Sequence, residues 1–272
     1  MGGGDLNQVS KYMRHVTSFE YKDEGIVVCA RDLYRFLQAN AGLEKLVVEV
    51  PLLHPDGIVS EPLTLMHLRH VELSGNLPFL LRNGNFLGNF SLPSLQILRM
   101  TRLKNGEDML YKLVDDKGTS FAELVELTAR SYTLGPRILT SVLLRAPKLE
   151  TLTCTGDSVN AVAKFLATRP ASDDPISINL PVMCPALTVL DLSQSANLRT
   201  GPVMQIVKER IALAASQDGG RYQLPGHDGC REVSRIRALR VDECPHIEEE
   251  MLPWFRKNVP QFSCRYDLRG KR

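Results

Sequence analysis

Residues 187–192, Leu-Thr-Val-Leu-Asp-Leu, place leucine at the first, fourth and sixth positions, and this spacing decides the fold. The same spacing of apolar residues returns six more times, at Leu43/Leu46/Val48, Leu68/Val71/Leu73, Leu95/Leu98/Met100, Leu124/Leu127/Ala129, Leu149/Leu152/Cys154 and Ile236/Leu239/Val241. Val16, Phe19 and Tyr21 make an eighth, weaker match. Most successive starts are 25 to 29 residues apart, and two are 38 and 49 residues apart. A fixed period of this length indicates that one supersecondary unit is repeated along the chain.

A period in the upper twenties is typical of a leucine-rich repeat, in which each unit is a short strand, a turn and a returning helix. A single unit cannot bury its apolar face, so the units stack. We therefore expect an α/β leucine-rich repeat solenoid, or horseshoe, with parallel strands on the concave face and helices on the convex face. It forms one domain over residues 1–272, with about 7 to 8 irregular repeats.

The segments between the strands show helical spacing of apolar residues. This spacing predicts helices over residues 32–39, 136–145, 158–168, 203–215 and 248–258, with Ser158 as a candidate N-cap. The two long intervals hold insertions near residues 169–181 and 216–232. Both are rich in proline or glycine, which predicts irregular loops between strands.

The composition narrows the cellular setting. The net charge is +2, from 33 basic and 31 acidic residues, which gives no reason to expect nucleic acid or a membrane as partner. The N-terminus has no apolar signal core, and no stretch reaches the roughly 20 apolar residues of a membrane span. The six cysteines are spread over the chain without Cys-x-x-Cys. We expect a soluble protein of the reducing cytoplasm or nucleus.

Motifs for catalysis and cofactor binding are missing from the sequence. It has no Gly-x-Ser-x-Gly, P-loop, Gly-x-Gly-x-x-Gly or His-Glu-x-x-His segment, so we expect neither an enzyme nor a cofactor. Cys230, Cys244 and His246 are the one set that suggests zinc, but their spacing of 14 and 2 residues fits no standard site. Cys244 is better explained as a turn residue of its repeat, so we expect no metal.

The residues between the repeat leucines should project from the opposite side of the sheet, because strand side chains alternate in direction. They carry both signs of charge in alternation, which suits a protein or peptide partner better than a nucleic acid. The alternative is that any solvated sheet is polar. The predicted partner-binding residues are Lys45, His70, Glu72, Arg99, Glu126, Arg130, Asp191, Arg240 and Asp242.

Residues 184 to 264 carry further motifs. They include Cys184-Pro185-x-Leu187-x-x-Leu190-Asp191-Leu192-Ser193, Asn197-Leu198-Arg199-Thr200-Gly201-Pro202, Val207-Lys208-x-Arg210 and Leu239-x-Val241-x-x-Cys244-Pro245-x-Ile247. This stretch resembles the F-box leucine-rich repeat proteins of mushroom-type fungi, whose repeats are similar to those of ribonuclease inhibitor. The resemblance implies a substrate receptor of a cullin–RING ubiquitin ligase, with a ubiquitination substrate as its protein partner.

Two departures from that family qualify the expectation. No segment matches the Leu-Pro-x-Glu opening of an F-box, and residues 1–15 are too few to hold one. We therefore expect binding to a Skp-type adaptor only if an F-box lies upstream. Ser195 also stands where the pattern has a cysteine. The alternative function is a free-standing leucine-rich repeat scaffold or regulator with no role in ubiquitination.

Overall fold

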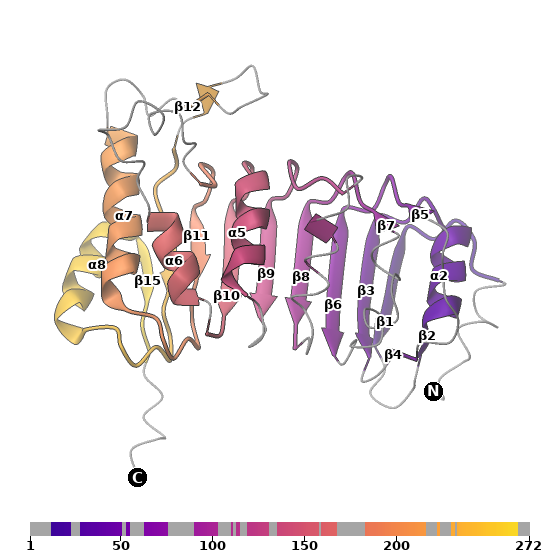
Figure 1. The fold of residues 1–272 in the computed structure, drawn as a ribbon, viewed down its shortest axis with the longest axis horizontal. Coiled ribbons are helices and arrows are strands. Elements are labelled where there is room, and N and C mark those ends of the chain that lie inside the picture. The colour runs from indigo at the N-terminus through magenta and orange to yellow at the C-terminus, as the bar shows by residue number, and fades with distance from the viewer. Residues whose placement is uncertain are drawn as a thin grey trace, which may run out of the picture. The chain divides into compact units, whose positions relative to one another are not determined.

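The structure is a computed structural model that describes residues 12–22, 28–50, 53–54, 63–75, 90–102, 110, 113–114, 119–130, 135–157, 159–167, 183–215, 222–223, 230–231 and 233–265. These residues form an α/β structure with mostly parallel strands (Figure 1). The chain divides into two compact units, Met1–Arg145 and Ala146–Arg272. None of the described helices has both the length and the apolar character needed to span a membrane.

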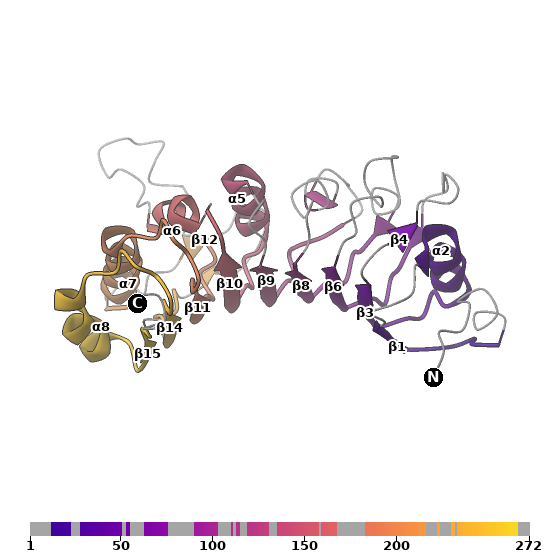
Figure 2. The same ribbon diagram turned by 90° about the horizontal axis from the view of Figure 1, so that it is seen from below.

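The first unit contains five parallel strands in sheet order: β1 (Ser18–Lys22), β3 (Lys45–Val50), β6 (His70–Gly75), β8 (Ile97–Thr101) and β9 (Glu126–Arg130). Two short parallel pairs join β2 (Val28–Cys29) to β4 (Leu53–His54) and β5 (Leu63–Thr64) to β7 (Phe90–Ser91). Helices α2 (Ala30–Ala39) and α5 (Pro136–Arg145) lie on one side of the five strands (Figure 2).

The second unit contains four parallel strands in sheet order: β10 (Thr151–Thr155), β11 (Val189–Asp191), β14 (Ala238–Arg240) and β15 (Gln261–Ser263). Its helices are α6 (Val159–Ala167), α7 (Thr200–Ala215), the 3-10 turn η2 (Glu249–Met251) and α8 (Leu252–Asn258). Helices α6 and α7 lie on one side of β10 and β11 (Figure 2). The pair β12 (Tyr222–Gln223) and β13 (Cys230–Arg231) is antiparallel.

The repeated apolar positions form the cores of both units. Every residue of the seven triplets is buried, with exposed fractions between 0% and 6%. In the weaker N-terminal match, Phe19 is buried, while Val16 and Tyr21 are half-buried next to or within the edge strand β1. The prediction that these side chains face the interior is therefore confirmed, and burial of apolar surface is the main force that holds the strands in place.

One hydrogen-bond arrangement recurs at the start of successive strands. A single carbonyl oxygen in one repeat accepts the amides of two adjacent residues in the next. Thr17 O, for example, accepts Glu44 N at 2.8 Å and Lys45 N at 3.1 Å. The other acceptor carbonyls with such a pair of amides are Glu44, Arg69 and Gln96 in the first unit and Glu150 and Thr188 in the second. These shared carbonyls fix the register between neighbouring strands.

A left-handed backbone conformation also recurs at one repeat position. Counting the first leucine of each triplet as one, the eighth residue has a positive φ in five repeats, between 56° and 107°. These residues are Gly75, Arg102, Gly156, Gln194 and Glu243. The chain turns out of the strand at this residue. Glycine adopts the conformation without steric cost, while the three other residue types adopt it at some cost.

The predicted helices agree with the structure to within a few residues. The helix over 136–145 is confirmed at both ends, and α2 begins two residues before the predicted start. Helix α7 begins at Thr200 rather than at residue 203, since Pro202 is tolerated in a first helical turn, where amides have no intrahelical acceptor. The helix over 248–258 divides into η2 and α8. Ser158, the candidate N-cap, lies outside the described residues.

Two parts of the second unit differ from the prediction. The insertion at 216–232 is not wholly irregular, because it contains the antiparallel pair β12 and β13. Strand β15 pairs in parallel with β14, with Phe262 opposite Leu239, and Val259, Phe262 and Cys264 repeat the triplet spacing where the sequence analysis counted no repeat. The insertion at 169–181 lies outside the described residues.

A buried arginine ties α7 to the segments that precede two strands. Arg210 is 3% exposed. Its two terminal nitrogens donate to four backbone carbonyls, those of Met183, Cys184, Leu187 and Ser234, at 2.8 to 3.3 Å. Burial lowers the pKa of Arg210 to about 10, so the side chain remains charged at neutral pH. The carbonyl dipoles stand in for the carboxylate that usually accompanies a buried cation.

Candidate functional site

The strand register of the first unit brings the predicted surface residues into rows. Strands β1, β3, β6, β8 and β9 align three rows of side chains, which alternate along each strand with the core residues, although Val47 and Ser74 within the rows are buried as well. The rows are Ser18–Lys45–His70–Ile97–Glu126, Glu20–Val47–Glu72–Arg99–Thr128 and Lys22–Glu49–Ser74–Thr101–Arg130. We call these side chains the charged face of the first unit.

Arg99 is the centre of a four-residue cluster on the charged face. Its Nε donates to Glu126 Oε1 at 2.6 Å, and its Nη2 donates to Glu126 Oε2 at 3.0 Å. Its Nη1 lies 3.5 Å from Glu72 Oε2. The hydrogen bonds to Glu126 raise the pKa of Arg99, and the charges of both carboxylates contribute in the same direction. The arrangement is the two-pronged geometry in which arginine binds a carboxylate most strongly.

His70 is the fourth member of this cluster. Its Nε2 lies 3.7 Å from Glu72 Oε2. This nitrogen is shielded from solvent, and it has no hydrogen-bond partner within the described part of the chain. Burial lowers the pKa of His70, as do the charges of Arg99 and Lys45, against the opposite influence of Glu72 and Glu126. The imidazole is therefore neutral at pH 7, and its approach to Glu72 is not an ion pair at that pH.

The remaining charges on this face are also paired with one another. Lys45 donates a hydrogen bond to Glu20, and Lys22 Nζ lies 4.0 Å from the same carboxylate. The hydrogen bond from Lys45 and the Lys45 charge lower the pKa of Glu20. Arg102 Nη2 donates to Glu49 Oε1 at 3.2 Å. Arg130 lies exposed at the end of β9.

Arg102 belongs to this network although the sequence reasoning did not select it. It occupies the eighth repeat position, just beyond the strand, and its φ of 56° belongs to the turn. The signal that could have found it is the triplet spacing itself, which places a turn residue beside the last outward-facing residue of every strand.

In the second unit the register confirms that Asp191 lies opposite Arg240, in a row that continues to Ser263. Asp191, however, is only 7% exposed, and its Oδ1 accepts the amide of Ser193 at 3.1 Å. The Oδ1 of Asp242 accepts Ser263 Oγ at 2.7 Å and Arg265 N at 2.8 Å. Both carboxylates therefore bind their own chain, and Arg240 is the exposed charge among the three.

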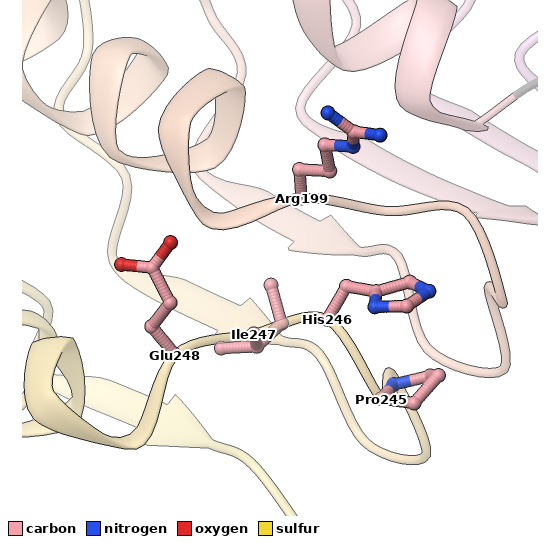
Figure 3. Close-up of a pocket in the computed structure, with 5 residues that line it drawn as sticks. All are labelled: Arg199, Pro245, His246, Ile247 and Glu248. Atoms are coloured by element: carbon pink, nitrogen blue, oxygen red, sulfur yellow. The ribbon is translucent and has the colours of Figure 1, made fainter.

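A shallow pocket of about 370 Å³ lies in the second unit between the turn before α7 and the turn before η2 (Figure 3). Arg199, Pro245, His246, Ile247 and Glu248 line it. The Arg199 side chain points away from the Pro245–Glu248 segment. The two turns are joined below the surface by Thr200, whose Oγ1 accepts Glu248 N at 2.8 Å. The exposed lining residues do not form an enclosed site that excludes water.

The cysteines with described side chains are buried or half-buried thiols. Cys154, Cys184, Cys244 and Cys264 form no disulfide with one another. Burial raises the pKa of Cys154 and Cys184 to about 12 and that of Cys244 to about 11, which opposes formation of the thiolate that binds zinc. Over the described ranges, no three His, Cys, Asp or Glu side chains gather as metal ligands. The side chain of Cys230 lies outside the described ones.

No protein-family model matches the chain, and no curated protein matches it.

Proposed function

We propose that the chain is a leucine-rich repeat solenoid that acts as a non-catalytic protein-recognition module. Three features of the described residues support the repeat assignment: the buried triplets, the carbonyls shared between successive strands, and the left-handed eighth residue. Each recurs at one position of the repeat within its own unit. Such agreement between the sequence period and the backbone is expected when stacked copies of one unit form a continuous core.

The observation that carries the recognition role is the paired charge pattern of the charged face. Its acids and bases hold one another in place through the Glu20–Lys45, Glu49–Arg102 and Arg99–Glu126 contacts. Side chains that are already ordered lose less conformational freedom when a partner binds. Both signs are present at fixed positions, which favours a protein or peptide of complementary pattern, whereas a nucleic-acid groove would be mostly basic.

The resemblance of residues 184–264 to fungal F-box repeat proteins suggests which class of protein is the partner. We propose that the partner is a protein marked for ubiquitination, met in the cytoplasm or nucleus, and that no enzyme activity or cofactor is involved. Binding of a Skp-type adaptor by these 272 residues is not expected, because none of their segments matches the F-box opening.

The recognition role is tested by placing a long cationic side chain at the centre of the charged face, where the Thr128 hydroxyl donates to Glu126 Oε1 at 3.5 Å. Thr128 is half-buried on β9, in the same row as Arg99, and Thr140 is a half-buried threonine on α5. Affinity capture from cell extract should recover the same proteins with the wild-type chain and with Thr140→Arg. Thr128→Arg should lose them, because the long side chain would cover the centre of the face. Equal recovery by both variants would remove the charged face from consideration.

The alternative is a free-standing scaffold or regulator, which the missing F-box motif favours. The two functions separate on a direct observation. An in-frame Leu-Pro-x-Glu segment in the coding sequence upstream of Met1 would support the receptor. Tight binding of a purified Skp-type adaptor to residues 1–272 alone would contradict the assignment of the adaptor site to an upstream segment.

A further inference from the structure

One carboxylate oxygen on the charged face stands between two donors. Glu72 Oε2 lies 3.5 Å from Arg99 Nη1 and 3.7 Å from His70 Nε2. Neither distance is that of a strong charge-assisted hydrogen bond, which is about 2.7 to 2.9 Å. Arg99 has its strong pair elsewhere, with Glu126, so its contact with Glu72 is the weaker of its two. The Glu72 carboxylate is therefore held loosely and can be taken by a better donor.

His70 is that donor when it carries a proton. Protonation places a hydrogen and a positive charge on the imidazole, whose Nε2 already faces Glu72 without another partner within the described residues. The charged groups that act on the ring are Lys45 from β3, Glu72 from β6 itself, Arg99 from β8 and Glu126 from β9, and the charge of His70 in turn acts on Glu20 of β1. The two cations lower the pKa of His70 and the two carboxylates raise it. The protonation of the ring therefore depends on both Glu72 and Arg99.

We propose that the charged face contains an acid-operated exchange of partners: when His70 takes a proton from solvent, Glu72 leaves Arg99 and binds the imidazolium, while Arg99 stays on Glu126. The exchange changes what the face presents. At neutral pH the four side chains sum to one negative charge, from two carboxylates and one guanidinium. After protonation they sum to zero, and Arg99 Nη1 is released toward solvent.

The direction of the pH dependence follows from the surroundings of the ring. Burial and two neighbouring cations lower the pKa of His70 from the ordinary value of 6.5, so the folded chain binds this proton less readily than the unfolded chain does. The free energy of unfolding should therefore fall as the pH falls below 6.5, because the unfolded state binds more protons there. The exchange operates in that acidic range and not at neutral pH.

The exchange is tested on the full chain by NMR titration of three side chains. The imidazole carbon resonance of His70, identified with His70→Gln, should titrate with a midpoint below 6.5. The Glu72 carboxylate carbon and the Arg99 terminal nitrogens should move with the same midpoint. A His70 titration that leaves the Glu72 and Arg99 resonances in place would overturn the exchange.

Two variants with opposite expected effects complete the test. Glu72→Gln should lower the His70 midpoint further, because it removes a carboxylate that favours the proton. Arg99→Gln should raise the midpoint, because it removes an opposing cation. Thr140→Arg on α5 is the control, and it should leave the His70 midpoint unchanged. A His70 midpoint that stays in place in either Glu72→Gln or Arg99→Gln would contradict the proposal.

A consequence for binding rests on the proposed recognition function. The dissociation constant of a partner captured by the charged face should change across the His70 midpoint in the wild-type chain and stay constant in His70→Gln. The NMR titration needs no partner, so a failure to find one would reject the recognition role and leave the proton exchange standing. If a partner bound Thr128→Arg as tightly as the wild-type chain while the titration came out as expected, the recognition role would also be rejected and the proton exchange would stand.

Discussion

Ser195 and Cys244 occupy the same position in consecutive repeats and make the same hydrogen bond. The Ser195 hydroxyl donates to the carbonyl of Ser193 at 3.3 Å. The Cys244 thiol lies 3.5 Å from the corresponding carbonyl of Asp242, and it also lies 3.3 Å from the carbonyl of Leu192 in the preceding repeat. Both side chains are completely buried. The cysteine expected at position 195 is thus replaced by a residue that serves the same backbone group.

This equivalence predicts how position 195 tolerates change. Ser195→Cys should alter the free energy of unfolding by less than about 1 kcal/mol, because the donor to Ser193 is kept. Ser195→Val should cost about 1 kcal/mol or more, since it leaves that partly buried carbonyl without its side-chain donor. Urea denaturation followed by circular dichroism measures both. Equal stability of the two variants would show that the hydrogen bond has no role.

The triplet leucines should carry most of the stability. Leu190 is fully buried in the second unit, so Leu190→Ala should cost about 2 to 5 kcal/mol in free energy of unfolding, from lost burial and the cavity that remains. Leu144 on α5 is 52% exposed and serves as the matched control. Leu144→Ala should stay within about 0.5 kcal/mol of the wild type. Similar losses in thermal denaturation for both variants would contradict the burial of position 190.

Two glycines with different backbone conformations should respond oppositely to substitution by alanine. Gly156 has a φ of 105°, so Gly156→Ala should cost about 1 to 2 kcal/mol, because a Cβ clashes with the following carbonyl in a left-handed conformation. Gly201 lies in the first turn of α7, and a Cβ there would meet open space. Gly201→Ala should stabilise the chain by about 0.4 to 1 kcal/mol. Changes of the same sign in chemical denaturation would show that backbone conformation does not set the effect.

The buried arginine of α7 should be sensitive to loss of its donors. Arg210→Met keeps much of the side-chain volume and leaves four carbonyls without the guanidinium, so the unfolding free energy should fall by more than about 3 kcal/mol. Lys208→Met on the same helix removes an exposed cation 5.6 Å from the Trp254 ring. That change should cost about 1 kcal/mol or less.

Calorimetry of the two variants side by side gives the comparison. A larger loss for Lys208→Met than for Arg210→Met would mean that the carbonyls around residue 210 find water as a replacement partner.

The sequence predicted the strands of the cores and the rows of the charged face well, because a period of two fixes which side chains share a side. Lys45, His70 and Glu126 lie in one row as expected. Which charged side chains form ion pairs with one another, within a row or between rows, was not predictable. Thr128 lies opposite Arg99, yet Arg99 binds Glu126, its diagonal neighbour, since the length of the arginine side chain decides which carboxylate it reaches.

Other features depended on contacts that are distant in the sequence. Arg210 falls on the apolar side of α7, after Val203 and Val207, but the sequence does not identify its partners, which are carbonyls 23 to 27 residues away. Asp191 looked like a surface charge, and its burial follows from the turn that its own carboxylate closes onto Ser193. Strand β15, by contrast, could have been found from the sequence, because Val259, Phe262 and Cys264 repeat the triplet spacing.

Because of the shared carbonyls at the strand starts, the register of successive strands does not depend on the number of residues between them. Glu150 O fixes where the strand beginning at Val189 starts, and Thr188 O does the same for Ala238, although 38 and 49 residues separate those strands. The intervening chain can lengthen without shifting any row of side chains, because it leaves and rejoins the sheet at hydrogen-bonded points of fixed geometry. Insertions between strands are thus a route by which such a chain can gain new loops while the rows of side chains keep their register.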